Sequence, residues 1–367
     1  CRPPIREHFE NPGAVRWRGN AHGSAKCSRT GTGGASPPAA HNGRVITLPA
    51  DLSPEAATAR IRDHLQVREP FAVAGAPATD AFDVVLKTSG SAGAAKAVGH
   101  SFAAVEWAAA TARRVLHDEG WRWLLMISPF ATGGFMTVAR SVPAPLVWPG
   151  AGGPFDACAL TDWYAGGAQA TSLVSTQLAR LLAIPAGVRL LQSMQVVLVG
   201  GGPFPATLKR RCTNLHIRAI ATYGATETLG GCVYDGLPWP GVTVSILDGQ
   251  IHLDGPNLAQ GYVPGPAITR PWPTGDLGHW QDGRLVVDGR LDDQIPVKGI
   301  NRRLRDYEAQ AMRRPGTLEA VAVAVPDDVD GYRVVVFTED AAQRLPRLDN
   351  GKPDRQELLR RARGQRR

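Results

Sequence analysis

Cysteine is scarce in this chain, and the cysteines form no pattern. The 367 residues contain five of them, none in a Cys-x-x-Cys pair. A scattered, odd-numbered set argues against a disulfide framework and against a zinc site. It is typical of proteins in a reducing cytoplasm, where we expect this one to be found. The five are Cys1, Cys27, Cys158, Cys212 and Cys232.

Long apolar runs are also absent. No segment approaches the length of a membrane span, so we expect no transmembrane helix. The start shows neither an initiator Met nor the pattern of a signal peptide. Residues 1–43 are rich in Gly, Pro, Ser and Arg without helical or strand periodicity, which predicts disorder or a wrongly assigned start.

The positive charge of the chain is not spread over its length. The formal net charge is +8, but the excess lies in residues 1–45 and 355–367, and the remainder is close to neutral. No patch that combines aromatic and basic residues accompanies these ends. We therefore expect no nucleic-acid partner.

The composition is that of an ordinary globular protein, with 43% hydrophobic and 20% charged residues. Its length suffices for two domains, which we place at residues 44–290 and 291–367. Apolar strands alternate with helices from residue 82, which predicts doubly wound α/β layers. Short strands with Gly, Pro and Asp turns from 232 to 288 predict a β-rich subdomain. The expected fold class is α/β, with a small, shortened α+β domain at the C-terminus.

Individual elements follow from the same patterns. Ser53 and Ser101 stand where N-caps are expected, before amphipathic or alanine-rich segments. We expect helices at 54–64, 102–117, 176–182 and 205–212, and strands at 84–86, 124–127, 171–174, 196–199, 244–247, 250–253 and 285–287.

The segment from Thr88 to Lys96 is rich in glycine and hydroxyl groups. Glycine lets the backbone approach phosphate oxygens, and amides and hydroxyls bind them. The segment is neither a Walker A loop nor Gly-x-Gly-x-x-Gly. We expect it to lie between a strand and a helix, which favours phosphate binding over an ordinary Gly-rich turn. The candidate ligands are Thr88, Ser89, Gly90, Ser91, Gly93 and Lys96.

Gly201 and Gly202 follow an apolar strand, where a flat ring could lie against bare backbone. A tight strand-to-helix turn explains these glycines equally well.

Residues 223–228 combine three chemical groups that a nucleotide site needs. Tyr223 offers an aromatic ring for adenine, and Gly224 follows it. Thr226 offers a hydroxyl for phosphate, and Glu227 offers a carboxylate for Mg²⁺, which prefers hard oxygen ligands. The alternative for Glu227 is a solvated surface charge.

Three segments further along complete the set. Asp276, in Thr-Gly-Asp-Leu, could accept hydrogen bonds from two ribose hydroxyls or be a turn residue. Arg290 offers a planar fork for phosphate or ribose oxygens, and Asp292 could be a hinge between the domains. Lys352 could place a compact positive charge on a phosphate or developing pyrophosphate, or be merely solvated.

In this order the segments resemble the acyl-CoA synthetase family of adenylating enzymes, over roughly residues 82–367. Residues 222–236, 170–178 and 139–142 are similar to those of 2-succinylbenzoate–CoA ligases. The resemblance implies that a carboxylate of 2-succinylbenzoate attacks the α-phosphate of ATP. The acyl-adenylate and pyrophosphate form, the small domain rotates, and the thiol of CoA displaces AMP. ATP, Mg²⁺ and CoA are thus implied, with a place in menaquinone synthesis, and a homodimer is left open.

The resemblance also implies a role for each candidate residue. It puts Ser89, Ser91 and Lys96 on phosphates, Thr226 and Glu227 on phosphate and Mg²⁺, Asp276 and Arg290 on the ribose, and makes Lys352 the adenylation lysine.

The chain departs from the family at three places. The loop has Ala92 and Ala95 where Thr and Pro are usual, and Ala131 stands where close relatives carry a His near the acyl pocket. Only residues 341–344 separate the segment ending at Asp340 from Leu345, where the family has a further helix and strand. Two alternatives therefore stay open, a ligase for another aromatic or acyl acid and a non-catalytic nucleotide-binding relative.

Overall fold

The computed structural model describes residues 45–88, 96–144, 146–147, 167–291, 294–297, 300–327, 331–340, 342–348 and 352–364. All of them belong to one compact unit, Ala39–Arg367. The predicted terminal segment 1–43 and the predicted hinge Asp292 lie outside the described residues. The domain boundary near residue 290 stays a prediction.

A seven-stranded sheet carries most of the architecture, in the order β11-β10-β9-β8-β7-β5-β6. From β6 to β9 the strands run parallel, and β10 and β11 continue the sheet antiparallel. The strands are β5 (Trp123–Leu124), β6 (Leu146–Val147), β7 (Ala170–Val174), β8 (Val196–Gly200), β9 (Ala219–Ala225), β10 (Gly230–Tyr234) and β11 (Leu237–Pro238).

Parallel strands need crossover connections, and helices supply them. The helices are α1 (Pro54–Val67), α2 (Phe102–Leu116), α3 (Thr132–Arg140), α4 (Ser175–Leu182), α5 (Pro185–Gln192), α6 (Ala206–Asn214), α7 (Leu304–Ala311) and α8 (Arg355–Gly364), with a 3-10 turn η2 (Thr226–Thr228).

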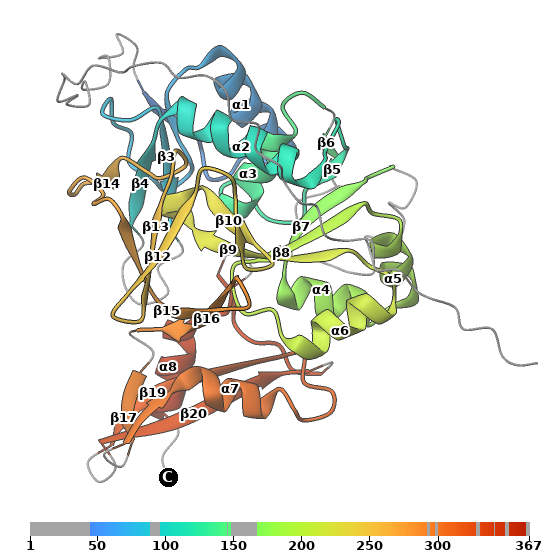
Figure 1. Ribbon diagram of the computed structural model, residues 1–367, viewed down its shortest axis with the longest axis vertical. Coiled ribbons are helices and arrows are strands. Elements are labelled where there is room, and N and C mark those ends of the chain that lie inside the picture. The colour runs from blue at the N-terminus through green and yellow to red at the C-terminus, as the bar shows by residue number, and fades with distance from the viewer. Residues whose placement is uncertain are drawn as a thin grey trace, which may run out of the picture. The chain divides into compact units, whose positions relative to one another are not determined.

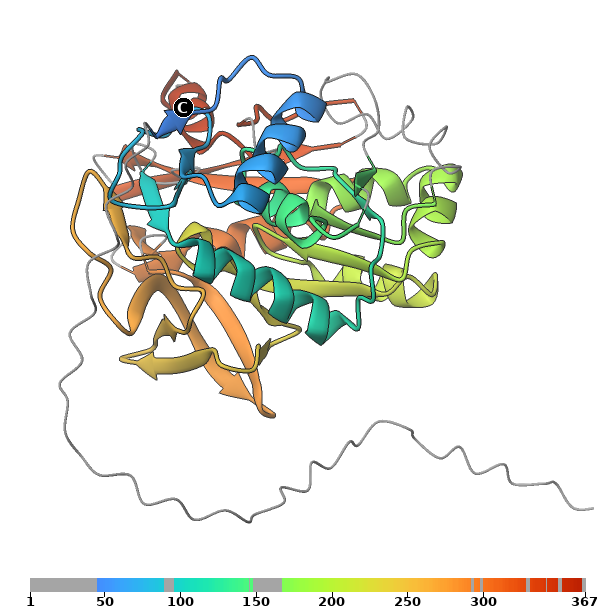
Figure 2. The same cartoon turned by 90° about the horizontal axis from the view of Figure 1, so that it is seen from above.

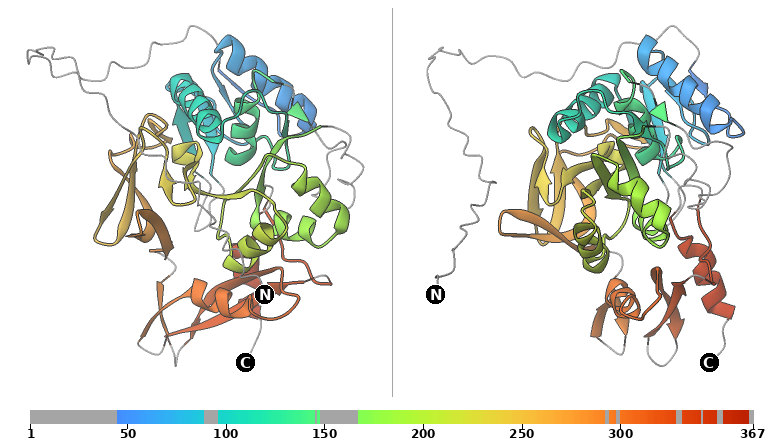
Figure 3. Two further views of the ribbon diagram at one scale, coloured as in Figure 1. Left: turned by 45° about the vertical axis from the view of Figure 1, so that its right-hand side comes forward. Right: turned by 90° about the vertical axis from the view of Figure 1, so that its right-hand side faces the viewer.

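Strand β8 shows that helices cover both faces of this sheet. Val196 and Leu198 pack into the core with α1, α2 and α3, which lie together (Figure 2). Val197 and Val199 pack into a second core with α4, α5 and α6 (Figure 3). Burial of alternate residues on opposite faces explains the continuous apolar run of this strand. The prediction of doubly wound α/β layers is confirmed.

Local sequence signals place two helices as expected. The Ser53 hydroxyl accepts a hydrogen bond from the amide of Ala56 at the start of α1, and Ser101 accepts one from Ala104 at the start of α2. The strand expected at 124–127 is shorter, however. The side chain of Gln177 donates to the carbonyl of Met126, so this carbonyl is taken by a side chain instead of a neighbouring strand.

Two further sheets flank the main one. A five-stranded sheet has the order β1-β2-β3-β4-β14, and a four-stranded antiparallel sheet has the order β12-β13-β15-β16 (Figure 1). The second is the predicted β-rich subdomain. The strands are β1 (Ile46–Thr47), β2 (Phe71–Ala72), β3 (Val84–Lys87), β4 (Ala97–His100), β14 (Gly261–Val263), β12 (Thr243–Leu247), β13 (Gln250–Asp254), β15 (Trp272–Gln281) and β16 (Arg284–Arg290).

The C-terminal part forms two antiparallel hairpins and two helices, as the α+β prediction requires. The hairpins are β17 (Gln294–Val297) with β18 (Ile300–Arg303), and β19 (Glu319–Asp327) with β20 (Gly331–Glu339). Leu358 of α8 packs on Val321 and Val323, and Leu304 of α7 packs on Ala322. The two helices therefore use alternate residues of β19. Among the described helices, none is both long and apolar enough to span a bilayer.

Asp118 generates a prediction about stability, because its buried carboxylate fixes the turn between α2 and β5. It accepts hydrogen bonds from the amides of Gly120 and Trp121 and, at 2.9 Å, from the indole of Trp123. Asp118→Ala leaves these donors without their acceptor and should lower the free energy of unfolding by about 2 kcal/mol. Urea denaturation followed by circular dichroism measures this, with the exposed Asp51→Ala as the control. Equal midpoints for the two variants would contradict the assignment.

Candidate active site

A cavity opens at the carboxyl ends of β7, β8 and β9, opposite the start of α3. In open α/β sheets this edge is where ligands bind. Four of the predicted site residues line the cavity although they come from three separate segments of the chain. They are Gly201, Gly224, Thr226 and Lys352.

Lys352 reaches the cavity from the C-terminal part and lies against the backbone of Gly201. A Cβ atom built on Gly201 would meet Lys352 Cε at 3.3 Å, and the φ of this glycine is +75°. Glycine is therefore needed here both for its backbone conformation and for the space that the lysine uses. At Gly202 a Cβ would meet nothing within 4 Å.

The environment of Lys352 destabilises its charged form. Burial lowers the pKa of its amine, the positive charge of Arg290 lowers it further, and the carboxylate of Asp276 opposes both. An anionic ligand in the cavity would relieve this penalty, because it would supply negative charge next to two cations.

Tyr223, Asp276 and Arg290 form one connected group beside the lysine. Asp276 and Arg290 are register partners of β15 and β16, and their side chains lie 3.4 Å apart from Arg290 Nη1 to Asp276 Oδ1. The hydroxyl of Tyr223, on β9, donates to Asp276 Oδ2 at 2.8 Å. Burial and the neighbouring Asp276 raise the pKa of Tyr223, so its hydroxyl stays protonated and remains a donor.

Thr226 and Glu227 occupy η2, and Thr226 lines the same cavity. The hydroxyls of Thr226 and Thr132 share a hydrogen bond of 2.8 Å, which joins η2 to the start of α3. Glu227 is buried, so it is not a solvated surface charge. Gly224 lets the chain fold back here, since a Cβ on it would lie 2.0 Å from the carbonyl oxygen of Gly230.

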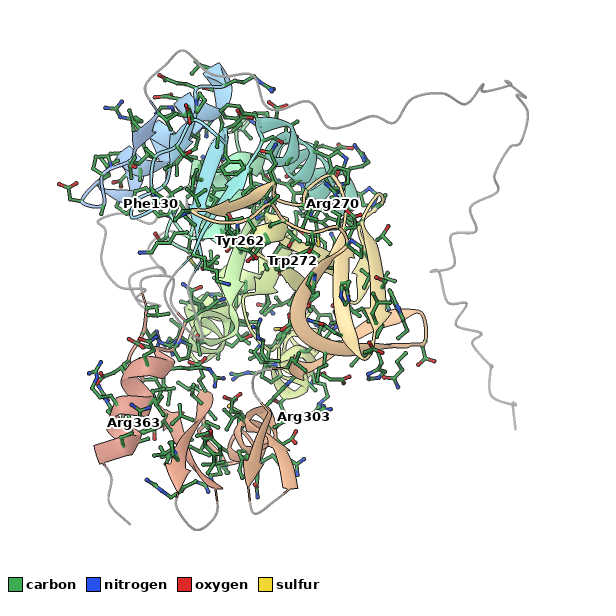
Figure 4. All side chains as sticks on the ribbon, turned by 90° about the vertical axis from the view of Figure 1, so that its left-hand side faces the viewer. Phe130, Tyr262, Arg270, Trp272, Arg303 and Arg363 are labelled. Atoms are coloured by element: carbon green, nitrogen blue, oxygen red, sulfur yellow. The ribbon has the colours of Figure 1, made fainter. Side chains whose placement is uncertain are left out.

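Tyr262, which the sequence did not single out, connects two predicted residues. Its hydroxyl donates to Glu227 Oε1 at 3.1 Å, and Lys96 Nζ lies 5.3 Å from the centre of its ring. Burial, together with the charge of Glu227, raises the pKa of Tyr262 to about 12. Figure 4 shows Tyr262 on β14 beside Trp272. The pairing of β14 with β4, which are distant in the sequence, brings Tyr262 to this position, and no local sequence pattern predicts it.

The glycine-rich loop is closed at its base by two hydrogen bonds. Thr88 N donates to the carbonyl of Lys96 at 2.7 Å, and Lys96 N donates to the Thr88 hydroxyl at 2.9 Å. The expectation that the loop leads into a helix is wrong, because it joins the antiparallel strands β3 and β4. Helix α2 begins only after β4. The predicted ligands Ser89, Gly90, Ser91 and Gly93 lie outside the described residues.

Glu227 is the residue available for a magnesium ion. Within the described ranges no three His, Cys, Asp or Glu side chains gather at one point. Magnesium is usually held by one or two carboxylates together with substrate phosphates, and it keeps several waters. A single carboxylate that follows the cavity-lining Thr226 therefore fits this ion.

Arg140 is a second residue that the sequence analysis left without a role. It ends α3, lines the cavity and is 6% exposed. Its guanidinium lies over the ring of Trp123 at 4.6 Å, with Ser172 Oγ 3.2 Å from Nη2 and the Tyr234 hydroxyl 3.4 Å from Nη1. Arg140 is the one charged residue in the stretch 132–141. That isolation in the sequence could have marked it as a candidate.

The charge of Arg140 has no carboxylate beside it among the residues that the structure describes. Burial lowers the pKa of Arg140, and Tyr234 opposes this first, followed by Asp118. The carboxylate of Asp118 already accepts the indole hydrogen of Trp123. The Nε of Arg140 also has no hydrogen-bond partner in the described part of the chain. Because a buried guanidinium is stabilised strongly by a carboxylate, the cavity offers a subsite for one.

Comparison with known proteins identifies the family. Residues 39–263 match the family described as AMP-binding enzyme. The chain belongs to this family. It is 35% identical over 267 residues to a Mycobacterium tuberculosis protein named probable 2-succinylbenzoate–CoA ligase, covering 69% of each chain.

Solved structures share the fold of this AMP-binding enzyme. A variant of Escherichia coli MenE with bound OSB-AMS superposes with a TM-score of 0.70 at 22% identity, covering 88% of each chain. The o-succinylbenzoate CoA synthetase of Bacillus subtilis, in complex with the acyl-adenylate intermediate OSB-AMP, gives a TM-score of 0.65 at 20% identity, covering 85% of this chain and 82% of the other. The resemblance drawn from the sequence motifs is confirmed at the level of the family and fold.

The lowered pKa of Lys352 in this AMP-binding enzyme gives a prediction about titration. Only a neutral amine reacts with acetic anhydride, so Lys352 should reach half-maximal labelling at a lower pH than free lysine. Asp276→Asn should lower that pH further, because it removes the charge that favours the ammonium form. Competitive labelling against N-acetyl-lysine amide, read by mass spectrometry, measures both. A midpoint at or above that of the free amine would refute the burial of this lysine.

Proposed function

We propose that this AMP-binding enzyme joins a carboxylic acid to CoA through an acyl-adenylate, and that the acid is 2-succinylbenzoate. The observation that carries the choice of acid is Arg140, a buried cation in the cavity. An acid with two carboxylates has one to activate and one to pair with this guanidinium. The name of the Mycobacterium tuberculosis relative supports the same substrate.

In the first step an oxygen of the acid's carboxylate attacks the α-phosphate of ATP, and pyrophosphate leaves. Lys352 stabilises the negative charge that develops on the departing phosphates. Asp276, held by the Tyr223 hydroxyl and by Arg290, accepts hydrogen bonds from the ribose. Lys96 and the hydroxyls of the loop at 88–96 bind the outer phosphates.

Thr226 and Glu227 complete the phosphate site. The hydroxyl of Thr226 donates to a phosphate oxygen, and the carboxylate of Glu227 holds Mg²⁺, which neutralises charge on the triphosphate when bound. In the second step the sulfur of CoA attacks the acyl carbon and AMP leaves. We propose that the C-terminal part, beginning near residue 291 with Asp292 as hinge, re-docks between the two steps.

The product would supply menaquinone synthesis. Both ATP and CoA are cytoplasmic metabolites, and the two cysteines in the described part of the chain, Cys212 and Cys232, are buried free thiols. We therefore place the enzyme in the cytoplasm.

Lys352→Ala separates the two steps. The variant should lose roughly 10²–10³-fold in ATP–pyrophosphate exchange, because one preorganised charge is missing from the transition state. It should still convert a supplied acyl-adenylate and CoA to thioester at the rate of the unmodified enzyme. Equal loss of both half-reactions would show that Lys352 does not act in adenylation alone.

Arg140 predicts the preference among acids. The unmodified enzyme should catalyse pyrophosphate exchange with 2-succinylbenzoate far better than with either monoacid derived from it, 4-oxo-4-phenylbutanoate or 2-butanoylbenzoate. Arg140→Gln should lower kcat/KM for the diacid by about 10- to 100-fold, the value of a hydrogen-bonded charge. The same variant should leave kcat/KM almost unchanged for whichever of the two monoacids the enzyme activates.

The same assay decides the alternative of another acid, which Ala131 motivates because it lines the cavity. A larger exchange rate with benzoate or a fatty acid than with 2-succinylbenzoate would establish that alternative. Binding of AMP with no exchange for any acid would establish a non-catalytic protein.

A further inference from the structure

Glu339, the last residue of β20, is a completely buried carboxylate that is held by arginines. Its exposed fraction is 0%. Oε1 accepts hydrogen bonds from Arg180 Nη2 at 2.5 Å and Arg344 Nη1 at 3.0 Å, and Oε2 accepts from Arg347 Nη2 at 2.6 Å and from the amide of Leu345 at 3.1 Å. Two residues therefore donate to each oxygen of this side chain, and Arg180 donates to Oε1 a second time, from Nε at 3.2 Å.

Arg180 belongs to a different part of the fold from the other three donors. It lies on α4, which packs on the seven-stranded sheet, 159 residues before Glu339. A second contact crosses at the same place, because Arg347 Nη1 lies 3.4 Å from the hydroxyl of Thr176, also on α4. The end of β20 and the segment that follows it are thus attached to α4 by two side-chain contacts.

The segment attached in this way carries Lys352. Leu345 and Arg347 are bound to Glu339, and Arg347 also pairs with Glu319 at 2.6 Å. From there the chain forms a narrow backbone hairpin, with Leu348 N donating to the carbonyl of Lys352 at 2.8 Å and Asp354 N to the carbonyl of Pro346 at 2.8 Å. The position of the Glu339 carboxylate therefore fixes the base of the hairpin from which Lys352 enters the cavity.

The shortness of this region makes the connection direct. The turn from β20 to the hairpin is closed by Asp340, whose carboxylate accepts from the amides of Ala342 and Gln343. Only residues 341–344 separate Asp340 from Leu345. Arg347, which contacts α4, and Lys352, which lines the cavity, are consequently close together in one short hydrogen-bonded segment.

The ion pair between Glu339 and Arg180 is stable at neutral pH, but it can be broken without leaving Glu339 unpaired. Burial alone would raise the pKa of Glu339, but the hydrogen bonds from Arg180, Arg347 and the Leu345 amide outweigh it and lower the pKa to about 2. The carboxylate is therefore ionised at neutral pH. If the segment moves away from α4, Arg344, Arg347 and Leu345 move with Glu339, so the buried charge keeps most of its donors.

We propose that Arg180, through its ion pair with Glu339, is a positioning residue that holds Lys352 in the cavity. Breaking this pair releases the hairpin from α4 and withdraws the ammonium group from the site of adenylation. The assignment of Lys352 to adenylation rests on the function proposed above, whereas the positioning itself does not.

The test compares Arg180→Gln with Arg344→Gln in the full chain. Both arginines bind Glu339 Oε1, but Arg344 belongs to the same segment as Glu339 and does not cross to α4. The first measurement is the rate of Lys352 acetylation in the free protein at a pH above the pKa of free lysine. The amine is then neutral in every variant, so the rate reports its accessibility, and no enzyme activity is required. We expect about a 10-fold increase in Arg180→Gln, little change in Arg344→Gln, and partial restoration in Arg180→Lys.

The second measurement is the ratio of the two half-reactions. Arg180→Gln should lower ATP–pyrophosphate exchange by about 10-fold and leave thioester formation from a supplied acyl-adenylate unchanged. Unaltered Lys352 labelling in Arg180→Gln, or an equal increase in Arg344→Gln, would overturn the proposal. So would equal loss of both half-reactions. If Arg180→Gln increases Lys352 labelling but the unmodified enzyme shows no ATP–pyrophosphate exchange, the positioning contact is upheld and the proposed function is refuted.

Discussion

The site depends on one contact, the approach of Lys352 to the bare backbone at Gly201. The lysine comes from the C-terminal segment and the glycine from the turn after β8, and a Cβ atom at position 201 would press on Lys352 Cε at 3.3 Å. Around this contact the carboxyl ends of three parallel strands contribute backbone, and β15 and β16 contribute Asp276 and Arg290. A cation, a carboxylate and exposed backbone thereby meet at one point, which is the combination that a nucleotide with its ribose and phosphates requires.

Two buried charges in this enzyme show the difference between a structural and a functional ion. Glu339 is surrounded by donors from its own chain, so its charge is fully compensated and needs no ligand. Arg140 has a ring face and three hydroxyls, from Thr137, Ser172 and Tyr234, but no carboxylate beside it among the described residues. A buried cation is unfavourable unless an anion accompanies it. The first charge therefore holds the fold together, and we propose that the second binds a carboxylate of the substrate.

Local chemistry made part of this structure predictable. Ser53 and Ser101 cap helices because a hydroxyl satisfies free amides wherever a helix begins. The apolar runs of β7 and β8 indicated buried strands, and the glycines and polar groups near the ends of β8 and β9 indicated a nucleotide site. These signals lie within a few residues of the features they predict.

Contacts between distant segments were not predictable in this way. Arg140 becomes significant only when Trp123 and Tyr234 enclose it, and Tyr262 only when β14 pairs with β4. Stacking of Tyr223 on adenine stays a prediction, but the hydrogen bond from its hydroxyl to Asp276, on another sheet, was not expected. In each case the partner is set by sheet order and crossover connections, which the spacing of residues along one chain does not encode.

The central claim is that a carboxylate oxygen attacks the α-phosphate of ATP in this cavity. Turnover of 2-succinylbenzoate labelled with ¹⁸O in its carboxylates, in the presence of ATP, Mg²⁺ and CoA, tests it most directly by mass spectrometry of the released nucleotide. The account predicts AMP carrying one ¹⁸O atom for each thioester formed. Label in inorganic phosphate with release of ADP, or AMP without label, would contradict it.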